Sequence, residues 1–345
     1  MPKGGRTVVP VSPPTPSGLE RVLFAGAGRE EIDAWVAGAV REALGADVTG
    51  VLFRAGRIDA VYGVRVGDGR AAVLKVHRPP VDPAELAATG EVLDLLAAAG
   101  YPCPRLLAAP VARDGRVATV QSFVGGGVPA QARRPEVRRA LAASLVEQVD
   151  VLRRAPSVRE LAARLGPGPA WTRYHRGPWP VPHDTIFDFS RTPDGWEWLD
   201  GFAREAADDV RRHRGTDEPV VAHGDFFEGN VQVAEGDGEE ARVVAVVDWD
   251  LVVEPEAVVA GLCAGGLLRD GAPTPAEVAA FLDDHAAARG RAPGGRDRAE
   301  AAAAARWVLA FNARCDLAML GTGDPDPASA LGRLAADRAA YRELG

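Results

Sequence analysis

The chain has 345 residues, of which 47% are hydrophobic and 26% charged, and its formal net charge is −8 at pH 7. This length allows two domains or lobes with sizeable cores, and the composition is ordinary for a soluble globular protein. The negative charge and the scattered arginines argue against a nucleic-acid partner, because nucleic-acid binders present massed positive charge.

Cysteine content and hydropathy indicate where the protein works. Cys103, Cys263 and Cys315 are too few and too widely spaced for a disulfide framework or a zinc site, so we expect reduced thiols in the cytosol. No apolar run reaches the roughly 18 residues of a membrane helix, and the first residues lack a secretory hydrophobic region. We therefore expect a cytoplasmic protein with no membrane contact. The sequence leaves the oligomeric state open.

The first part of the chain predicts a tail, a helix and a β-rich block. Residues 1–20 are rich in Pro, Gly and Ser and predict a flexible tail. Residues 30–44 carry apolar side chains at helical spacing. Three segments rich in β-branched residues follow and predict strands, at 48–56, 60–78 and 111–124.

Turn residues place the hairpins of this block. Asp68-Gly69 and Asp114-Gly115 lie between apolar runs, which is the strongest short-range signal for a β-hairpin. Between the second and third β-rich segments, residues 82–100 have a helical pattern that stops at a glycine. We therefore expect an antiparallel sheet with one helix inserted before its last hairpin.

After residue 124 the pattern becomes mostly helical. Residues 135–165 predict helices, and residues 256–345 predict Ala-rich helices. Between them lie an irregular stretch that holds four of the seven Trp, up to Trp198, and then two strand-like segments joined by a polar turn.

This order of elements indicates an α+β fold in two lobes. We expect a small N-terminal lobe with an antiparallel sheet over residues 21–121. We expect a larger, mostly helical C-terminal lobe over residues 122–345.

The segment HGDFFEGN, residues 223–230, has the spacing H-x-D-x-x-x-x-N. Phosphoryl transfer needs a carboxylate on the attacking hydroxyl and oxygen ligands that hold Mg²⁺ on the phosphates. Asp225 and Asn230 on one tight loop can supply both. The run VVAVVDWD contains a second acid, Asp248, which a β-hairpin would bring beside this loop. The alternative, an ordinary turn capped by Asn230, is less favoured because it leaves Asp248 unexplained.

Three further residues are interpreted more cautiously from the sequence. Lys75 lies in the alternating strand AAVLKVHR and could reach nucleotide phosphates as a point charge. The alternative is an ordinary exposed strand lysine, although lysines are rare in this Arg-rich chain. We expect His223 to hold its turn by packing and hydrogen bonding, and Trp249 to belong to the core or to a cleft wall.

These residues resemble the motifs of the aminoglycoside phosphotransferase family, the small-molecule branch of the protein-kinase-like fold. The resemblance covers about residues 45–265 and depends most on HGDFFEGN and VVAVVDWD. It implies a two-lobe protein-kinase-like fold with Asp225 as the catalytic base. By the same resemblance Asn230 and Asp248 would be the Mg²⁺ ligands and Lys75 the phosphate-binding lysine.

The resemblance also locates a nucleotide site for ATP or GTP. VQSFVGG would be the hinge, where backbone groups of Gln121, Ser122, Phe123 and Val124 meet adenine. RAGRIDAVYG would be the loop that covers the nucleotide. It has a single glycine before its turn, Gly56, and lacks G-x-G-x-x-G.

The chain departs from the family pattern at two further places. The family pairs its lysine with a Glu on the lobe helix, where this chain has Thr89. Glu85, one turn earlier on the same helix face, could replace it. The family often places an Asp three residues after a Pro that follows the second acidic motif, where this chain has Val258. Glu256 could compensate for that Asp.

Two segments are candidates for binding the acceptor. One is the aromatic and acidic stretch before residue 198, which includes Asp184 and Asp188, and the other contains Asp250 and Glu254. Aromatic faces with carboxylates between them suit a polyhydroxylated or cationic small molecule. The alternative is that the aromatic residues only fasten an irregular segment. Asp250 is the better single candidate because it lies two residues from Asp248.

The sequence therefore predicts a Mg²⁺-dependent kinase that transfers the γ-phosphate of ATP or GTP to a hydroxyl of a small molecule, of the aminoglycoside, sugar or amino-alcohol type. Positioning and charge neutralisation would supply most of the catalysis. The departures at the lobe helix and after the second acidic motif motivate an alternative, a catalytically silent nucleotide-binding protein of the same fold, against which the intact set of Asp225, Asn230 and Asp248 argues. A protein kinase is disfavoured because no D-F-G and A-P-E pair frames an activation segment.

Overall fold

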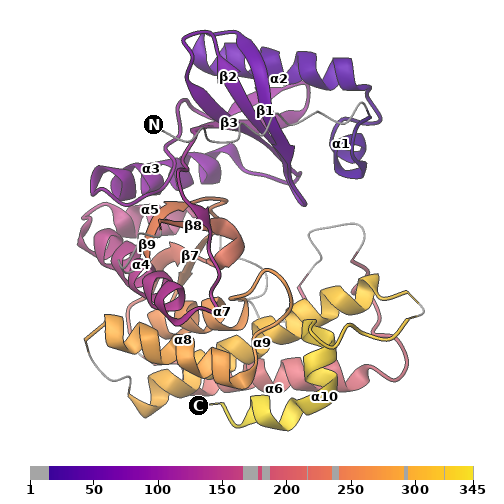
Figure 1. Ribbon diagram of the computed structural model, residues 1–345, viewed down its shortest axis with the longest axis vertical. Helices are drawn as coiled ribbons and strands as arrows, with labels where there is room; N and C mark the ends of the chain where they lie inside the picture. The colour runs from indigo at the N-terminus through magenta and orange to yellow at the C-terminus, as the bar shows by residue number, and fades with distance from the viewer. Residues whose placement is uncertain are drawn as a thin grey trace, which may run out of the picture. The chain divides into compact units, whose positions relative to one another are not determined.

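The computed structural model of this protein describes residues 15–165, 178–180, 187–215, 217–234, 241–290, 294–321 and 323–344. Contacts divide the chain into two compact units. Unit 1 contains the described residues up to Asp94 together with Pro104–Phe123, and unit 2 contains Leu95–Cys103 and the described residues from Val124 onward. Unit 1 is built on an antiparallel sheet and unit 2 is mostly helical (Figure 1), so the predicted α+β fold is confirmed.

Five antiparallel strands form the sheet of unit 1, in the order β1-β2-β3-β5-β4. Their bounds are β1 Val48–Ala55, β2 Ala60–Val66, β3 Ala71–His77, β4 Val111–Arg113 and β5 Arg116–Ser122. Both predicted hairpins are present, β2–β3 and β4–β5. Asp114 and Gly115 have φ values of 50° and 73°, as a tight type I′ hairpin turn requires.

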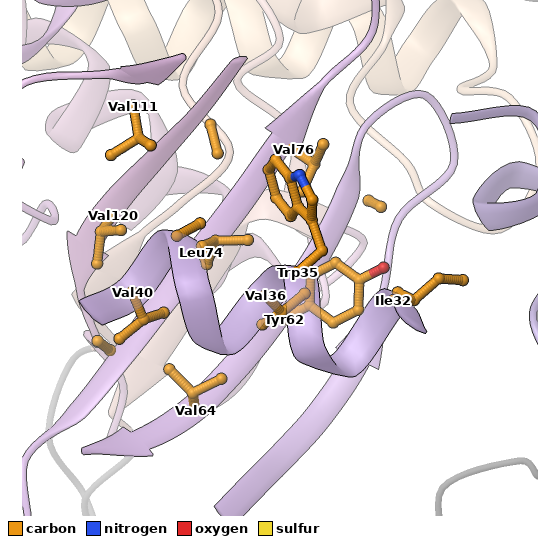
Figure 2. Packing of buried hydrophobic residues seen from close by; sticks show 14 of the residues in the cluster. Ile32, Trp35, Val36, Val40, Tyr62, Val64, Leu74, Val76, Val111 and Val120 are labelled. Carbon is orange, nitrogen blue, oxygen red and sulfur yellow. The ribbon is translucent and has the colours of Figure 1, made fainter. Parts of the chain in front are cut away.

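Helix α2 (Arg29–Leu44) covers one face of this sheet (Figure 2). Its buried side chains, Ile32, Trp35, Val36 and Val40, lie against Tyr62, Val64, Leu74 and Val76 of the central strands. Each fully buried side chain of this size contributes about 1.5–3 kcal/mol. Successive strand residues face opposite sides of a sheet. Because Leu74 and Val76 face α2, Lys75 lies on the opposite face.

The flexible tail expected over residues 1–20 is too long at its end, because helix α1 (Gly18–Leu23) begins before residue 20. Ser17 and Glu20 form a capping box, with hydrogen bonds of 3.2 and 2.7 Å. Glu20 also accepts hydrogen bonds from Arg29 and from the Tyr62 hydroxyl. Burial would raise the pKa of Glu20, but these bonds outweigh it and lower the pKa to about 2. Residues 1–14 lie outside the described part of the chain.

The predicted helix after β3 is α3 (Pro83–Ala98), and it runs from unit 1 into unit 2. It begins after Asp82, whose carboxylate accepts a hydrogen bond from the Ala84 N–H at 2.8 Å. This is the cap that the helix N-terminus needs for its unpaired N–H groups.

Unit 2 contains two small antiparallel sheets. One pairs β6 (Val128–Pro129) with β8 (Val231–Ala234) and β8 with β9 (Arg242–Val246); the other pairs β7 (Val220–His223) with β10 (Leu251–Glu254). The predicted β8–β9 hairpin is confirmed. Strand β10 was not anticipated, because its four residues merge with the apolar start of the next helix.

Seven helices complete the described part of unit 2: α4 Pro135–Arg154, α5 Val158–Arg164, α6 Glu197–His213, α7 Glu256–Gly265, α8 Pro275–Ala288, α9 Gly295–Met319 and α10 Ala330–Arg342. The long α9 packs against both α6 and α7 (Figure 1). A Cβ added at Gly261 or Gly265 of α7 would lie 2.1 Å from the Ala301 carbonyl or 2.4 Å from the Ala305 carbonyl. Glycine at these two positions of α7 is therefore required for this close approach.

Two expectations about the chain as a whole can be compared with the structure. None of the helices in the described ranges is long and apolar enough to cross a membrane. All three cysteines are buried and form no disulfide, as the sequence predicts.

A partly buried cluster of ion pairs joins α4, α7 and α8. Glu256, the first residue of α7, pairs with Arg153 at 2.9 Å and with Arg289, and it lies 3.5 Å from His285. Arg289 also pairs with Asp150. Burial would raise the pKa of Glu256, but His285 and the two arginines outweigh it and lower the pKa to about 2. Glu256 thus ties three helices together and does not take the place of the family's bracing Asp.

We predict that Glu256→Gln lowers the free energy of unfolding at neutral pH by roughly 2–3 kcal/mol, because it removes the charge that Arg153, Arg289 and His285 face together. A lowered folded-state pKa means that this contribution is present above pH 4.5 and is lost as the pH falls toward 2. The difference between wild type and variant should therefore shrink over that range in urea titrations. Glu205→Gln, which removes the acid of a more exposed ion pair between α6 and Arg342, is the matched control. A difference that stays constant with pH would contradict the assignment.

Candidate active site

His223, which is fully buried, holds the loop after β7 in place through hydrogen bonds. Its Nδ1 accepts a hydrogen bond from the Asp225 N–H at 3.2 Å, and its Nε2 lies 3.2 Å from the Val247 carbonyl. The His223 N–H donates to the side chain of Gln148 at 3.0 Å. The ring that accepts at Nδ1 donates at Nε2, so it serves both partners as the neutral tautomer. The expected role of His223 in holding the turn is confirmed.

Asn230 closes the same loop on Asp225. It ends the short 3₁₀ helix η2 (Glu228–Asn230) and is buried, whereas Asp225 is exposed. The Asn230 Nδ2 donates to the Asp225 carboxylate at 3.1 Å and to the Asp225 carbonyl at 2.9 Å. The amide thereby orients the carboxylate, and its oxygen Oδ1 is the atom that remains to bind a cation.

Two backbone hydrogen bonds bring the second acidic segment to this loop. The Val247 N–H donates to the Asn230 carbonyl at 2.9 Å, and the Gly224 N–H donates to the Asp250 carbonyl at 2.7 Å. Asp248 lies between these two anchor points, in the turn from β9 to β10. The structure therefore places Asp225, Asn230 and Asp248 in adjoining turns of unit 2, as the hairpin argument predicts.

Asp248 has a strained backbone. Its φ is 58°, in the left-handed region that costs a non-glycine residue about 1–2 kcal/mol. Its neighbour Trp249 is buried, donates to the Val246 carbonyl at 3.0 Å and stacks on His223 with ring centroids 4.7 Å apart. Trp249 is thus a core residue, one of the two roles expected for it, and its packing holds the exposed Asp248 in this conformation.

The donors at this site suit a hard cation. The Asp248 carboxylate and the Asn230 amide offer oxygen ligands, which Mg²⁺ prefers. Within the described ranges no group of three or more His, Cys, Asp or Glu could hold a metal ion by itself. A cation here would therefore need further oxygens, and the phosphates of a bound nucleotide could supply them.

Unit 1 carries Lys75 and Gly56 of the predicted nucleotide site. The Lys75 ammonium forms an ion pair with the Asp59 carboxylate at 3.2 Å. Gly56 lies in the loop between β1 and β2 with a φ of 123°, and a Cβ there would lie 1.9 Å from the Asp59 carbonyl oxygen, so only glycine fits. Glu85, the partner considered from the sequence, is exposed on α3.

Asp59 is the residue that sequence reasoning missed. It directly precedes Ala60, which pairs with Val76 in the β2–β3 ladder, and Val61 pairs with Lys75. The predicted Asp-Gly turn does not give this register: Val66 bonds to Arg70 across a three-residue loop, so the β2–β3 pairing is displaced by one residue from that of a two-residue turn at Asp68-Gly69. The family pattern directed attention to the lobe helix instead.

The four predicted hinge residues lie where the chain leaves unit 1. Gln121 and Ser122 end β5, where Gln121 pairs with Val73 and the Ser122 N–H donates to a loop carbonyl at 2.9 Å. The Phe123 side chain is 47% exposed, and its ring centroid lies 6.4 Å from that of Phe53. Val124 is the first residue after this point that belongs to unit 2.

The four acceptor candidates differ in their surroundings. Asp250 is exposed in the turn before β10. Asp188 is exposed, and hydrogen bonds from the Ser190 hydroxyl and N–H lower the pKa of its carboxyl. Asp184 lies outside the described residues.

Glu254 is buried at the far end of the β7–β10 ribbon. Leu251 pairs with His223 beside the loop that carries Asp225, whereas Glu254 pairs with Val220 three residues along the ladder. Its carboxylate forms an ion pair with Arg214. This position favours a structural role for Glu254 over acceptor binding.

The described part of the aromatic stretch packs against α9. Phe187 stacks on Phe189, and Phe189 contacts Phe311 edge to face, with ring centroids 6.0 Å apart in both pairs. The guanidinium of Arg314 lies 4.7 Å from the Phe189 ring centre and donates hydrogen bonds to the carbonyls of Asp188 and Arg191. These contacts favour the alternative in which the aromatic residues fasten an irregular segment.

Comparison with protein families matches residues 49–254 to the phosphotransferase enzyme family. This span includes Gly56, Lys75, Asp225, Asn230 and Asp248. No curated protein matches the chain.

Solved structures resemble the chain at low sequence identity. An amicoumacin kinase described as a complex with AMP-PNP and Ca²⁺ has a TM-score of 0.63 at 11% identity, covering 92% of this chain and 97% of that one. An aminoglycoside phosphotransferase from Alicyclobacillus acidocaldarius has a TM-score of 0.52 at 16% identity, covering 88% and 92%. A thermostable mutant of the aminoglycoside phosphotransferase APH(4)-Ia has the same score and identity, covering 89% and 98%. At these identities the likeness shows the fold alone.

We predict that Asp248→Gly abolishes activity yet yields a more stable protein than Asp250→Gly, by roughly 1–2 kcal/mol, because glycine relieves the strain at φ 58°. Asp250 is the matched control, since it is an exposed acid in the same turn without a positive φ. Chemical denaturation of both variants measures the difference. Equal stabilities would show that the strain at Asp248 costs nothing measurable.

Proposed function

The chain belongs to the phosphotransferase enzyme family, and we propose that it transfers the γ-phosphate of a nucleoside triphosphate, ATP or GTP, to a hydroxyl group of a small molecule. The observation that supports this most is the convergence of Asp225, Asn230 and Asp248. The three residues lie inside the span that matches the family. Phosphoryl transfer depends on positioning and charge stabilisation, and the site offers the groups for both.

Asp225 is the proposed base. Its carboxylate is exposed, so it can reach an acceptor hydroxyl, and it is oriented by the Asn230 amide at 3.1 Å. The hydrogen bond from its own N–H to His223 fixes the backbone from which the carboxylate projects. In this role it orients the hydroxyl towards the phosphate and accepts its proton as the new bond forms.

Asn230 and Asp248 are the proposed ligands of Mg²⁺. Their oxygens fit a hard cation, and the strained backbone of Asp248 is a cost that a metal-binding role would offset. When bound, Mg²⁺ would neutralise charge on the nucleotide phosphates. The chain itself contributes the fixed separation of the two ligands, through the hydrogen bond between Val247 and the Asn230 carbonyl.

Unit 1 is proposed to bind the nucleotide. Lys75 offers a positive charge for the phosphates, and Gly56 allows the tight loop between β1 and β2. Backbone groups from Gln121 to Val124 would meet the base, as the family resemblance implies.

The acceptor is proposed to be a hydroxylated molecule that carries positive charge. Asp250 is exposed beside the catalytic loop, with its carbonyl bonded to Gly224. A carboxylate there would bind an amino group of the acceptor by a charge-assisted hydrogen bond. Asp188 is a second, weaker candidate, because its carboxylate already accepts two bonds from Ser190.

One observation favours the alternative of a catalytically silent nucleotide-binding protein. The lobe helix offers Lys75 no acid at the family position, where Thr89 stands, and Glu85 is exposed. The complete set of Asp225, Asn230 and Asp248 argues against this alternative, because a silent protein could lose these residues without harm to its fold. A screen of purified protein for nucleoside diphosphate release separates the two, over aminoglycosides, sugars, amino alcohols and nucleosides. Nucleotide binding with no transfer to any acceptor would favour the silent protein.

We predict that Asp225→Asn lowers kcat by about 10²–10⁴-fold while nucleotide affinity stays nearly unchanged, because the amide keeps the shape but cannot accept the proton. Product formation is followed by mass spectrometry of the phosphorylated acceptor, and affinity by calorimetry. Asp208→Asn, at an exposed position of α6, is the control and should retain full activity. If Asp225→Asn kept more than a few per cent of the activity, Asp225 would not be the base.

For the acceptor, Asp250→Ala should raise KM by about 10–100-fold for a cationic substrate and leave the affinity for nucleotide unchanged, since a bond to a charged group contributes about 1.5–3 kcal/mol. Added salt should narrow the gap between wild type and variant. Asp188→Ala, tested in parallel, is expected to change KM much less. Unaltered acceptor kinetics in Asp250→Ala, or an anionic acceptor, would refute the acidic pocket.

A further inference from the structure

The ion pair of Lys75 with Asp59 lies within unit 1 and joins two neighbouring strands. Asp59 ends the loop between β1 and β2, and Lys75 lies on β3. The two charged atoms are 3.2 Å apart, and the side chains are only 18% and 17% exposed. At this burial the attraction is screened much less than that of a surface pair.

Asp59 is itself rigidly held. Its Oδ1 accepts a hydrogen bond from the Arg78 N–H at 2.9 Å, and its Oδ2 lies 3.2 Å from Nδ1 of His77. The other nitrogen of His77 lies 2.9 Å from the Thr119 hydroxyl. Burial would raise the pKa of Asp59, but His77, Lys75 and the Arg78 N–H outweigh it and hold the pKa well below its usual range. The carboxylate is therefore a fixed negative charge at neutral pH.

The loop that carries Asp59 is equally constrained. Gly56 packs on the Asp59 carbonyl so closely that a Cβ would lie 1.9 Å from the oxygen. The turn at Gly56 therefore constrains the backbone before Asp59, and the β2–β3 ladder that begins at Ala60 constrains the backbone after it. A change in this loop must shift the carboxylate that Lys75 contacts.

The family position on the lobe helix holds no acid in this chain. Thr89 stands at the position where the family has its Glu, and its hydroxyl donates to the Glu85 carbonyl at 3.1 Å. The Glu85 side chain is exposed. Within unit 1, an acid that pairs with Lys75 is Asp59, which directly precedes β2.

We propose that Asp59 is the positioning residue of Lys75, so that the loop covering the nucleotide, and not the lobe helix, sets the place of the phosphate-binding lysine. This inference rests on the proposed function, because it assigns Lys75 to the phosphates. Asp59 acts through Lys75 and does not contact the reacting atoms.

The expected signature is a split between kcat and affinity. Without Asp59 the ammonium can still follow the phosphates in the ground state, and one negative charge near them is gone. Nucleotide binding should therefore survive, whereas the alignment needed in the transition state is lost. A merely structural defect would instead weaken the binding of nucleotide and of adenosine, which has no phosphate, alike.

The test uses the full chain with ATP and an acceptor from the screen. Asp59→Asn should lower kcat at least tenfold, change the dissociation constants of ATP and adenosine by less than threefold, and add nothing to the loss caused by Lys75→Ala. Asp59→Glu keeps the charge and should recover a substantial part of kcat. If Asp59→Asn fails to fold, Asp59→Glu becomes the test, and the inference then requires that it keep more than a tenth of the wild-type kcat.

Two matched variants separate this role from general damage. Thr119→Val removes the hydroxyl at His77 but leaves the ion pair, and Glu85→Gln removes the acid of the lobe helix; both should stay within threefold of wild type. The inference is overturned if Asp59→Asn keeps its kcat, if its effect multiplies with that of Lys75→Ala, or if Glu85→Gln is the damaging change. If the wild-type protein transfers no phosphate at all, both the proposed function and this inference are wrong. If the wild-type protein is active and Asp59→Asn is equally active, only the inference is wrong.

Discussion

Two backbone hydrogen bonds hold the candidate active site together, from Gly224 to the Asp250 carbonyl and from Val247 to the Asn230 carbonyl. They fasten the loop after β7 to the turn after β9. Because both use main-chain atoms, they leave the side chains of Asp225 and Asp248 exposed for chemistry. The scaffold that brings these two acidic residues into adjoining turns is thus made of main-chain hydrogen bonds.

Buried residues behind this turn make the arrangement stable. His223 bonds to both segments and stacks on Trp249, and Trp249 is anchored at the Val246 carbonyl. The burial of these two rings offsets the backbone strain at Asp248. Further back, Gly261 lets α7 approach α9 closely. The exposed acids are therefore supported by buried, well-packed residues, which catalysis by precise positioning would require.

Lys75 of unit 1 is held in a different way, by an ion pair between side chains. Asp59 directly precedes β2, so the register of the β2–β3 ladder places it near Lys75. A partner on α3 would depend instead on a helix whose residues divide between the two units at Asp94 and Leu95. The pair of Lys75 with Asp59 stays wholly inside unit 1, so its geometry does not depend on how that helix is held.

The sequence by itself determined the elements and the main catalytic candidates. Hydrophobic periodicity placed α2, Asp-Gly pairs placed two hairpins, and the spacing of Asp225 and Asn230 indicated one loop, because these signals act over a few neighbouring residues. Only the tertiary structure decided which distant groups meet. The pairing of Asp59 with Lys75, the burial of Glu254 at the far end of the β7–β10 ribbon and the short strand β10 all depend on contacts between segments far apart in the chain or on strand register, and no local pattern encodes these contacts.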